Sequence, residues 1–284
     1  MRPVRPWLAL LRFEEYGPLF LLAGLAGSLY AGSASPVGLF GLLAFIGLFS
    51  ASAFVLNDVV DWREDSLSTE TRNPLSLGEL GRSSAVAVFV LLSAGSVAAL
   101  YFIRPPALYA APLVYGLYWG YSWGPKFKTL PVVDIAVHGV VPALFVVMGY
   151  AISAPPSAGT YLLAGVVFCL AAMSGVLQEV RDLGKDSAFG KTSATRLGMG
   201  RSVGLAELLV VSGVALIAVS ALTGVLPLGV LALTPLGYLL VSPLRALKSG
   251  NIGAAKAISE IRLRGLLLTV VLFAAYLAFV YLPF

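Results

Sequence analysis

The sequence predicts an all-α, polytopic membrane protein. Of its 284 residues, 58% are hydrophobic and 12% are charged, and the mean hydropathy is +0.90. A soluble domain carries about 25% charged residues, so half of that share indicates that lipid is the main solvent. Apolar runs of about 20 residues, the length that crosses a bilayer, recur along the whole chain. We therefore expect one integral membrane domain over residues 1–284, without a separate soluble domain.

Nine of these runs are long enough to be transmembrane helices. In chain order, the predicted spans are about 16–33, 37–57, 83–103, 106–123, 132–153, 159–179, 203–223, 225–242 and 264–282. Pro235 interrupts the eighth span and Pro243 follows it, and proline removes a backbone hydrogen bond from a helix. Two polar connections, about 60–82 and 181–202, exceed the usual loop length, and loops of that size are usually functional or disordered.

The basic residues are distributed unequally between the two predicted sides of the membrane. Of the 19 Lys and Arg, all except Arg104 lie near the N-terminus or in connections from an even to an odd span. The positive-inside rule places that side in the cytoplasm. We therefore expect a multi-pass protein of the cell membrane with a cytoplasmic N-terminus. The net charge of +5 then reflects topology and does not indicate nucleic-acid binding.

Two acidic clusters with the same spacing lie at the ends of the second and sixth predicted spans. The first reads Asn57-Asp58-x-x-Asp61-x-x-x-Asp65, and the second reads Gln178-Glu179-x-x-Asp182-x-x-x-Asp186. In each, an amide is followed by aspartates four and eight positions later, which fall on one face of a helix. Carboxylates beside a bilayer are costly to desolvate, so both clusters indicate a function.

The matching clusters predict an internal repeat. An even number of spans separates them, so both face the cytoplasmic side. This pattern indicates parallel four-helix repeats over about 1–123 and 124–242, followed by a ninth helix. An inverted repeat, common in transporters, would place the clusters on opposite sides of the membrane. Two copies on one side can converge on a shared site.

Clusters of carboxylate and amide oxygens suit Mg²⁺, which prefers carboxylates together with substrate phosphates. Both clusters occupy C-terminal helix ends, where the helix dipole favours cations. Bound Mg²⁺ reverses the local sign and can bridge to a polyanion. Basic residues that could hold the remaining phosphate oxygens are Arg12, Arg72, Lys126, Lys128 and Lys191. This combination favours departure of a diphosphate over nucleophilic catalysis, and no nucleophile-elbow or P-loop motif occurs in the sequence.

The first cluster resembles the first aspartate-rich motif of the UbiA-type intramembrane prenyltransferases, and Asp182-x-x-x-Asp186 resembles the second. The segment from Tyr121 to Thr129, YSWGPKFKT, is similar to their tyrosine-to-lysine segment after the fourth helix. Nine spans and two long polar loops match as well, so the resemblance covers nearly the whole chain. Gln178 and Glu179 depart from the pattern, because many members carry aspartate there, and neither is assigned as a ligand.

The resemblance implies a ring of nine helices around a central cavity that is capped by cytoplasmic loops. It also implies Mg²⁺-assisted ionisation of an allylic isoprenyl diphosphate, giving a carbocation that an acceptor captures. One Mg²⁺ would be held by Asn57, Asp61 and Asp65, with Asp58 as a ligand or a neighbouring group, and a second by Asp182 and Asp186. The expected catalytic residues are Asp61, Asp65, Asp182 and Asp186, and the expected diphosphate contacts are Arg12, Arg72, Tyr121, Lys126, Lys128 and Lys191.

Aromatic side chains are frequent in the fourth predicted span. Aromatic residues near span ends usually form an interfacial belt. Alternatively, they line a cavity for the prenyl chain or acceptor and steady a carbocation with their π-faces. Tyr115 and Tyr118, three positions apart, are the candidates for this role. His138, the only histidine, lies in the fifth span and is either a packing residue or a cavity residue.

The predicted function is isoprenyl transfer from a polyprenyl diphosphate to a small aromatic acceptor such as 4-hydroxybenzoate. Two alternatives stay open. The first is geranylgeranyl transfer to a glycerol-phosphate lipid, as in archaeal ether-lipid synthesis. The second is a cation-coupled transporter, because buried carboxylates also mark ion pathways, although a transporter would not need long basic loops after each cluster. A CDP-alcohol phosphotransferase would need its aspartates within one continuous motif, whereas these clusters lie far apart.

Overall fold

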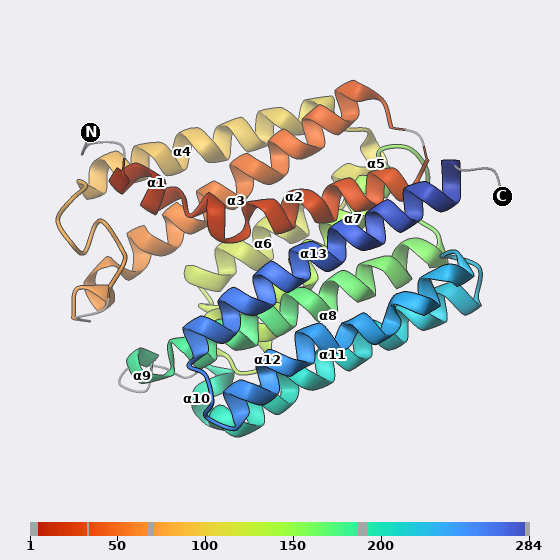
Figure 1. The fold of residues 1–284 in the computed structure, drawn as a ribbon. Helices are drawn as coiled ribbons and strands as arrows, with labels where there is room; N and C mark the ends of the chain where they lie inside the picture. Colours follow the sequence, from red (N-terminus) through yellow and green to blue (C-terminus); the bar gives the residue numbers. More distant parts are fainter. Residues whose placement is uncertain (1–4, 33, 68–70, 187–191, 282–284) are drawn as a thin grey trace. The chain divides into compact units, whose positions relative to one another are not determined.

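The protein is helical throughout the part of the chain that the structure describes. The computed structural model describes residues 5–32, 34–67, 71–186 and 192–281. Within these ranges the regular structure consists of α-helices and 3₁₀ helices, and no strand occurs (Figure 1). The predicted all-α class is therefore confirmed.

The chain divides into two compact units. The first comprises Met1–Lys128 and Val141–Thr160, and the second comprises Thr129–Val140 and Tyr161–Phe284. Helix α7 (Val133–Ala151) begins in the second unit and ends in the first. Each unit has a buried apolar core of its own.

Helix α3 (Pro36–Asp65) is the central element of the first unit. Its start is capped by Ser35, whose hydroxyl oxygen accepts a hydrogen bond from Gly38 N, and Pro36 occupies the first helical turn. Helix α3 packs against α1 (Arg5–Leu11), α2 (Phe13–Tyr30), α4 (Arg82–Ala99) and α6 (Ala111–Ser122). The unit also contains η1 (Leu100–Phe102) and α5 (Pro105–Leu108), and η2 (Phe127–Thr129) begins in it.

Helix α3 is longer than the sequence pattern indicated. The predicted loop over about 60–82 begins only after Asp65, where the helix ends. The last turns remain helical because their acidic side chains are buried against polar and basic partners. The whole first acidic cluster therefore lies on one continuous helix.

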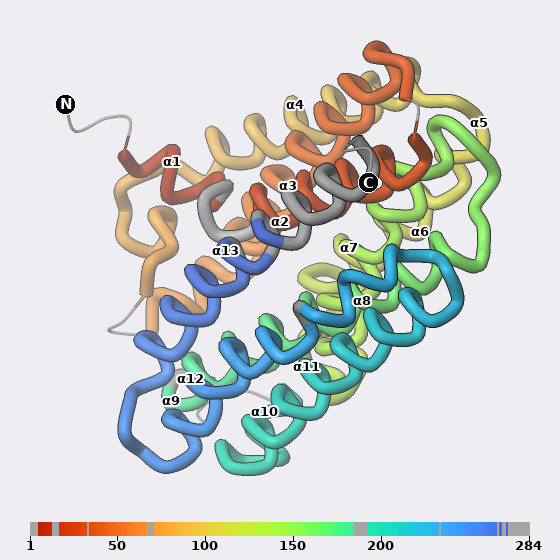
Figure 2. Tube along the Cα trace, turned by 45° about the vertical axis from the view of Figure 1, so that its right-hand side comes forward, coloured from red at the N-terminus to blue at the C-terminus, as the bar shows by residue number. Residues whose placement is uncertain are grey.

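The second unit is built on two long helices, α8 (Ala158–Arg181) and α11 (Met199–Leu222). Its other elements are α9 (Leu183–Asp186), α10 (Ser193–Leu197), η3 (Leu228–Gly237), α12 (Tyr238–Lys248) and α13 (Ala254–Tyr281). Helix α12 packs against both α11 and α13 (Figure 2). The core of this unit combines α8, α11, α12 and α13 side chains, among them Val176, Val203, Leu244 and Ala257.

Five helices in the described ranges are long and apolar enough to cross a membrane. They are Pro36–Asp65, Arg82–Phe102, Val133–Ala151, Ala158–Arg181 and Met199–Leu222, and they coincide with five of the predicted spans. A shorter apolar helix, Gly17–Tyr30, coincides with the first predicted span. The fourth predicted span is divided between α5 and α6, and the eighth between η3 and α12. The count of nine membrane-spanning helices stays a prediction.

Helices α2 and α7 cross at very close range in the first unit. A Cβ atom added to Gly27 would lie 2.0 Å from the carbonyl oxygen of Val146, and one added to Gly149 would lie 2.0 Å from that of Gly24. Because a Cβ atom cannot approach a backbone oxygen so closely, both positions require glycine. Small residues allow membrane helices to pack closely in this way.

We expect Gly149→Ala to force α2 and α7 apart and to lower the thermal unfolding midpoint of the detergent-solubilised protein. Overpacking of this kind costs about 1–3 kcal/mol. Gly116→Ala is the matched control, because a Cβ at this helical position meets nothing within 4 Å. Alanine is favoured over glycine in a helix by about 0.5–1 kcal/mol, so the control should unfold at the parent temperature or above it. Equal midpoints for both variants would contradict the close crossing.

Candidate active site

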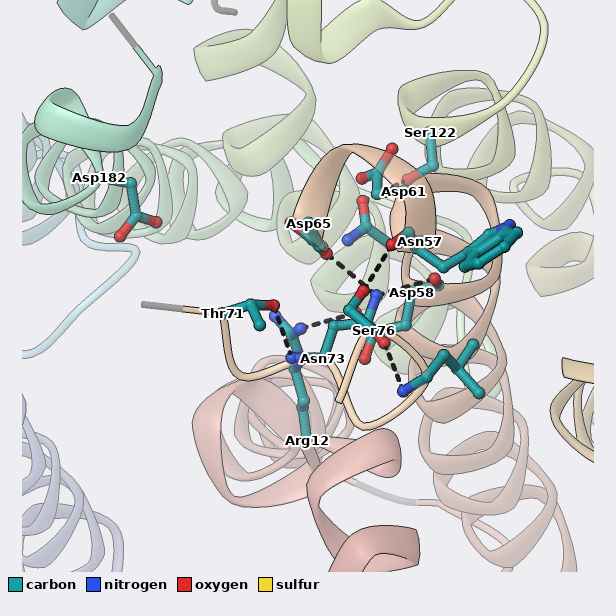
Figure 3. Close-up of polar contacts among 12 residues, drawn as sticks. Arg12, Asn57, Asp58, Asp61, Asp65, Thr71, Asn73, Ser76, Ser122 and Asp182 are labelled. Carbon is teal, nitrogen blue, oxygen red and sulfur yellow. Dashed lines mark hydrogen bonds and ion pairs between the residues drawn. The ribbon is translucent and has the colours of Figure 1, made fainter. Parts of the chain in front are cut away.

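Three aspartates are buried on the last turns of α3. Asp58 is 0% exposed, and Asp61 and Asp65 are each 8% exposed. A buried carboxylate is costly unless it is paired and hydrogen-bonded. The partners of these three side chains therefore fix the segments around the end of α3, and Figure 3 shows two of these partners, Arg12 and Asn73.

Asp58 is paired with Arg12. Arginine Nη2 lies 2.6 Å from Asp58 Oδ1. Arg12 lies at the junction between α1 and α2, and its backbone is in the left-handed region with φ of 44°. The sequence pattern predicted Arg12 as a diphosphate contact, and the structure shows that its guanidinium reaches the first acidic cluster.

The segment after α6 supplies two further cations to the same helix. Lys128 forms a short ion pair with Asp61 Oδ2. Lys126 Nζ lies 3.4 Å from Glu64 Oε1, in a more exposed pair. At the end of α6, the Ser122 hydroxyl donates a hydrogen bond of 2.9 Å to Asn57 Oδ1. Two of the three lysines that were predicted to hold phosphate, Lys126 and Lys128, thus lie beside the first cluster.

Asp65 is held by a neutral donor from the loop after α3. Asn73, which is 1% exposed, donates from Nδ2 to Asp65 Oδ2 at 3.0 Å and to the carbonyl oxygen of Asp58 at 2.9 Å. Its neighbour Arg72 is exposed to solvent. The loop therefore returns to α3 and places Arg72 next to a residue that contacts the cluster.

The donor set on α3 fits Mg²⁺. Carboxylate and amide oxygens are the ligands that Mg²⁺ prefers. Asp58 Oδ2 and Asp61 Oδ1 are buried without a hydrogen-bond partner among the described residues, and such oxygens are costly unless a donor or cation satisfies them. Among all the residues that the structure describes, no group of three or more His, Cys, Asp or Glu side chains is arranged so that it could hold a metal ion. Arg12, Lys128 and Asn73 each contact a different one of the three aspartates.

The second acidic cluster belongs to the second unit. Arg181 binds both oxygens of Asp182, with Nε 2.7 Å from Oδ1 and Nη2 2.8 Å from Oδ2. The Asp182 side chain is 42% exposed. The side chain of Asp186 and the whole of Lys191 lie outside the described residues. The predicted roles of these residues therefore stay predictions.

Two buried carboxylates in the second unit bind the start of α10. Asp134 accepts hydrogen bonds from the backbone N and the hydroxyl of Ser193, at 2.8 and 2.7 Å. Glu179 Oε2 accepts a hydrogen bond of 2.9 Å from Ala194 N. Both acids bind backbone, so Glu179 has a structural contact that agrees with leaving it out of the ligand set.

The aromatic candidates are packed in the first unit. Tyr118 is 8% exposed and lies edge-on to Phe20 and Phe49. The Tyr115 hydroxyl lies 2.5 Å from Ser96 Oγ, and its ring also contacts Phe49. Tyr121 extends the group through Tyr118, with ring centroids 6.3 Å apart. These rings form a packed aromatic cluster within this unit.

His138 lies in the second unit and packs against α8. A Cβ atom added to Gly175 would lie 2.8 Å from His138 Cγ, so the absence of a side chain at this glycine makes room for the imidazole. The contact describes a packing role for His138. Its predicted role in an acceptor cavity stays a prediction.

Sequence reasoning missed four residues that organise these sites. They are Asn73, Ser122, Asp134 and Arg181. For two of them, the amino-acid sequence contains a signal that could have identified them. Asn73 precedes Pro74, a dipeptide that marks a turn, and Asp134 is an acid inside a predicted span, where ionisable residues are rare and have specific partners.

The comparison with protein families finds a model of the UbiA prenyltransferase family that matches residues 19–257. A protoheme IX farnesyltransferase from Nitrosococcus oceani is 32% identical over 116 residues. This match covers 40% of the present chain and 38% of that relative, so it spans well under half of the relative's length.

Solved structures with the same fold cover almost the entire chain. A UbiA homologue from Archaeoglobus fulgidus, bound to GPP and Mg²⁺, has a TM-score of 0.71 and 21% identity, covering 95% of this chain and 98% of that one. A structure described as digeranylgeranylglyceryl phosphate synthase in membranes has a TM-score of 0.72 and 16% identity, with coverages of 96% and 98%. At these identities, the likeness shows the shared fold.

We expect Asp134→Ala to destabilise the second unit, because it leaves the backbone N and hydroxyl of Ser193 without their acceptor. Leaving buried polar groups unpaired costs about 1–3 kcal/mol each, which should appear as a lower thermal unfolding midpoint in detergent. Ser193→Ala is the matched comparison, because it removes the hydroxyl, and with it the acceptor of Val132 N, but keeps the bond from Ser193 N to Asp134. It should have the smaller effect, and a reversed order would contradict this role of Asp134.

Proposed function

Because this chain belongs to the UbiA prenyltransferase family, we propose that it transfers an isoprenyl group from a polyprenyl diphosphate to a small aromatic acceptor. Family membership makes the chain an intramembrane prenyltransferase and an integral membrane protein. The identities of the prenyl donor and of the acceptor go beyond family membership and are our proposal. The observation that carries it is the set of buried aspartates on α3, which basic side chains approach from separate segments.

The metal ligands in this proposal come first from α3. Asn57, Asp61 and Asp65 would hold one Mg²⁺, with Asp58 as a ligand or neighbouring group. Bound Mg²⁺ would neutralise charge on the diphosphate and so make it a better leaving group. The Archaeoglobus fulgidus homologue, which is bound to GPP and Mg²⁺, supports this choice of metal and donor. From the sequence repeat, we infer that Asp182 and Asp186 hold a second ion.

The basic residues would bind and orient the diphosphate. Lys128, Lys126 and Arg12 already lie beside the α3 aspartates, and Arg72 is exposed next to Asn73. Fixed cations stabilise the negative charge that develops on a departing diphosphate without reorganising during the reaction. Tyr121, at the end of α6, and Lys191, by sequence alone, complete the proposed set.

The apolar groups would protect the cation that remains after the diphosphate departs. Tyr115 and Tyr118 belong to an aromatic cluster, and aromatic π-faces stabilise a nearby positive charge. Excluding water prevents hydrolysis of a reactive intermediate. Tyr115 and Tyr118 are therefore the proposed lining for the prenyl chain or acceptor. His138 is proposed for such a lining from its sequence position alone.

The orientation in the membrane follows from charge. Basic residues lie almost wholly on the predicted side that carries both acidic clusters. By the positive-inside rule, that side is cytoplasmic. We infer that the N-terminus and the active site face the cytoplasm of the cell, where a water-soluble aromatic acceptor would be available.

A glycerol-phosphate lipid is the second candidate acceptor. One specific observation favours it, because a structure described as digeranylgeranylglyceryl phosphate synthase shares this fold over 96% of the chain. The partial match to a protoheme IX farnesyltransferase adds a porphyrin acceptor to the compounds that deserve an assay.

We expect Asp61→Asn and Asp182→Asn each to lower Mg²⁺-dependent pyrophosphate release by roughly 100-fold or more, because each removes a negative ligand charge. The assay uses the purified chain in proteoliposomes with geranylgeranyl diphosphate and an acceptor, and EDTA should abolish the signal until Mg²⁺ is restored. Glu79→Gln, an exposed acid in the loop after α3, should keep the parent rate. Parent-like turnover by Asp61→Asn would reject the assignment of α3 as the metal site.

The acceptor is identified by product analysis with labelled donor. Membranes that contain the protein are incubated with labelled geranylgeranyl or farnesyl diphosphate and with 4-hydroxybenzoate, geranylgeranylglyceryl phosphate or protoheme. We expect a prenylated 4-hydroxybenzoate as the main product, formed only with Mg²⁺. A main product from either other acceptor would overturn the proposed acceptor while leaving the prenyltransferase activity in place.

A further inference from the structure

We propose that Asn73 is a positioning residue that fixes the carboxylate of Asp65 for metal binding. The inference rests on the proposed function of α3 as the Mg²⁺ site. Asn73 is not itself a ligand in this proposal. It acts through Asp65, in the way that hydrogen-bonding groups behind a metal ligand set its orientation.

The hydrogen bonds of Asn73 hold its side-chain amide in one orientation. Nδ2 donates to Asp65 Oδ2 and to the carbonyl oxygen of Asp58, while Oδ1 accepts from Leu75 N at 3.0 Å. Its backbone N also donates to Thr71 Oγ1 at 3.2 Å. An asparagine side chain offers two N–H donors and one carbonyl acceptor, and all three are used. Figure 3 shows Asn73 between Asp65 and the loop that carries Thr71.

The loop around Asn73 is fastened to α3 by two more contacts. Leu75, 7% exposed, packs with Val55 and Val59 of α3. The Ser76 hydroxyl donates a hydrogen bond of 2.6 Å to the carbonyl oxygen of Trp62. Asn73 is therefore held independently of Asp65, which is the condition for one side chain to fix another.

The chemistry of the amide suits this task better than a cation would. Arg12 and Lys128 place positive charge on Asp58 and Asp61, and such charge competes with a divalent ion for the carboxylate. The amide of Asn73 restrains Asp65 without adding charge. The contact therefore fixes the orientation of Asp65 Oδ2 without itself bringing a positive charge to the carboxylate.

The test compares Asn73→Ala with Ser76→Ala in the purified full-length protein. Mn²⁺ is the probe. Its affinity for the protein is measured by electron paramagnetic resonance in the absence of diphosphate, so that catalysis cannot affect the measured affinity. We expect Asn73→Ala to weaken Mn²⁺ binding by about 10–100-fold, the usual loss when a group behind a metal ligand is removed. Ser76→Ala loosens the same loop without touching Asp65 and should bind Mn²⁺ like the parent. Equal losses in both variants would overturn the proposal, because they would indicate loop anchoring alone.

A double-mutant comparison separates failure of this inference from failure of the proposed function. If Asn73 acts through Asp65, Asn73→Ala should cause no further loss of Mn²⁺ affinity in an Asp65→Ala background. Additive losses would overturn the positioning role. Parent-like affinity in Asp65→Ala alone would instead reject Asp65 as a ligand, and with it the proposed metal site. Thermal unfolding midpoints of all variants confirm that each is folded during the measurement.

Discussion

The burial of three carboxylates at the end of α3 is the constraint on which the first unit depends. Each would be costly in an apolar surrounding, and the negative end of the helix dipole adds to that cost. The structure compensates them with Arg12 from the junction of α1 and α2, Lys128 from η2 and Asn73 from the loop after α3. Two segments distant in sequence and the loop that follows α3 are thereby fixed around one helix end.

The second unit uses buried carboxylates in a different way. Asp134 and Glu179 accept hydrogen bonds from Ser193 and Ala194 at the start of α10. Backbone N–H groups hold a carboxylate in place but cannot move to a substrate as a lysine or arginine side chain can. This difference in partners separates acids that organise a loop from acids that suit a catalytic site. Glu179 thus has a structural contact through Oε2, although its sequence position lies beside the second acidic cluster.

The helical class and the acidic pattern could be predicted because both depend on local sequence. Apolar runs define helices, and spacing of four and eight positions places Asn57, Asp61 and Asp65 on one face. The pairing of Arg12 with Asp58 could not be predicted in the same way, because it joins residues far apart in the chain and depends on how α1 meets α2. Asn73 shows the same limit, since its sequence signal indicates a turn but not the carboxylate that the turn approaches. The fourth predicted span is divided into α5 and α6, and Pro112 lies in the first turn of α6, where proline is favoured.

Backbone conformation gives independent support to the importance of these contacts. Among the described residues, three that are not glycine have positive φ, namely Arg12 at 44°, Lys126 at 50° and Val132 at 73°. Such conformations cost of order 1–3 kcal/mol each and persist only where surrounding contacts enforce them. Glycine would adopt them without strain, but it would supply no cation to Asp58 or Glu64. At Arg12 the charge is paired with the fully buried Asp58, whereas Lys126 is paired with the exposed Glu64, and exposed pairs contribute only about 0–1 kcal/mol. Val132 is held similarly, because its backbone N donates to Ser193 Oγ in the network of Asp134. At Arg12 and Val132 the positive φ therefore coincides with a buried polar contact, so the contacts that organise Asp58 and Asp134 also hold these backbone conformations.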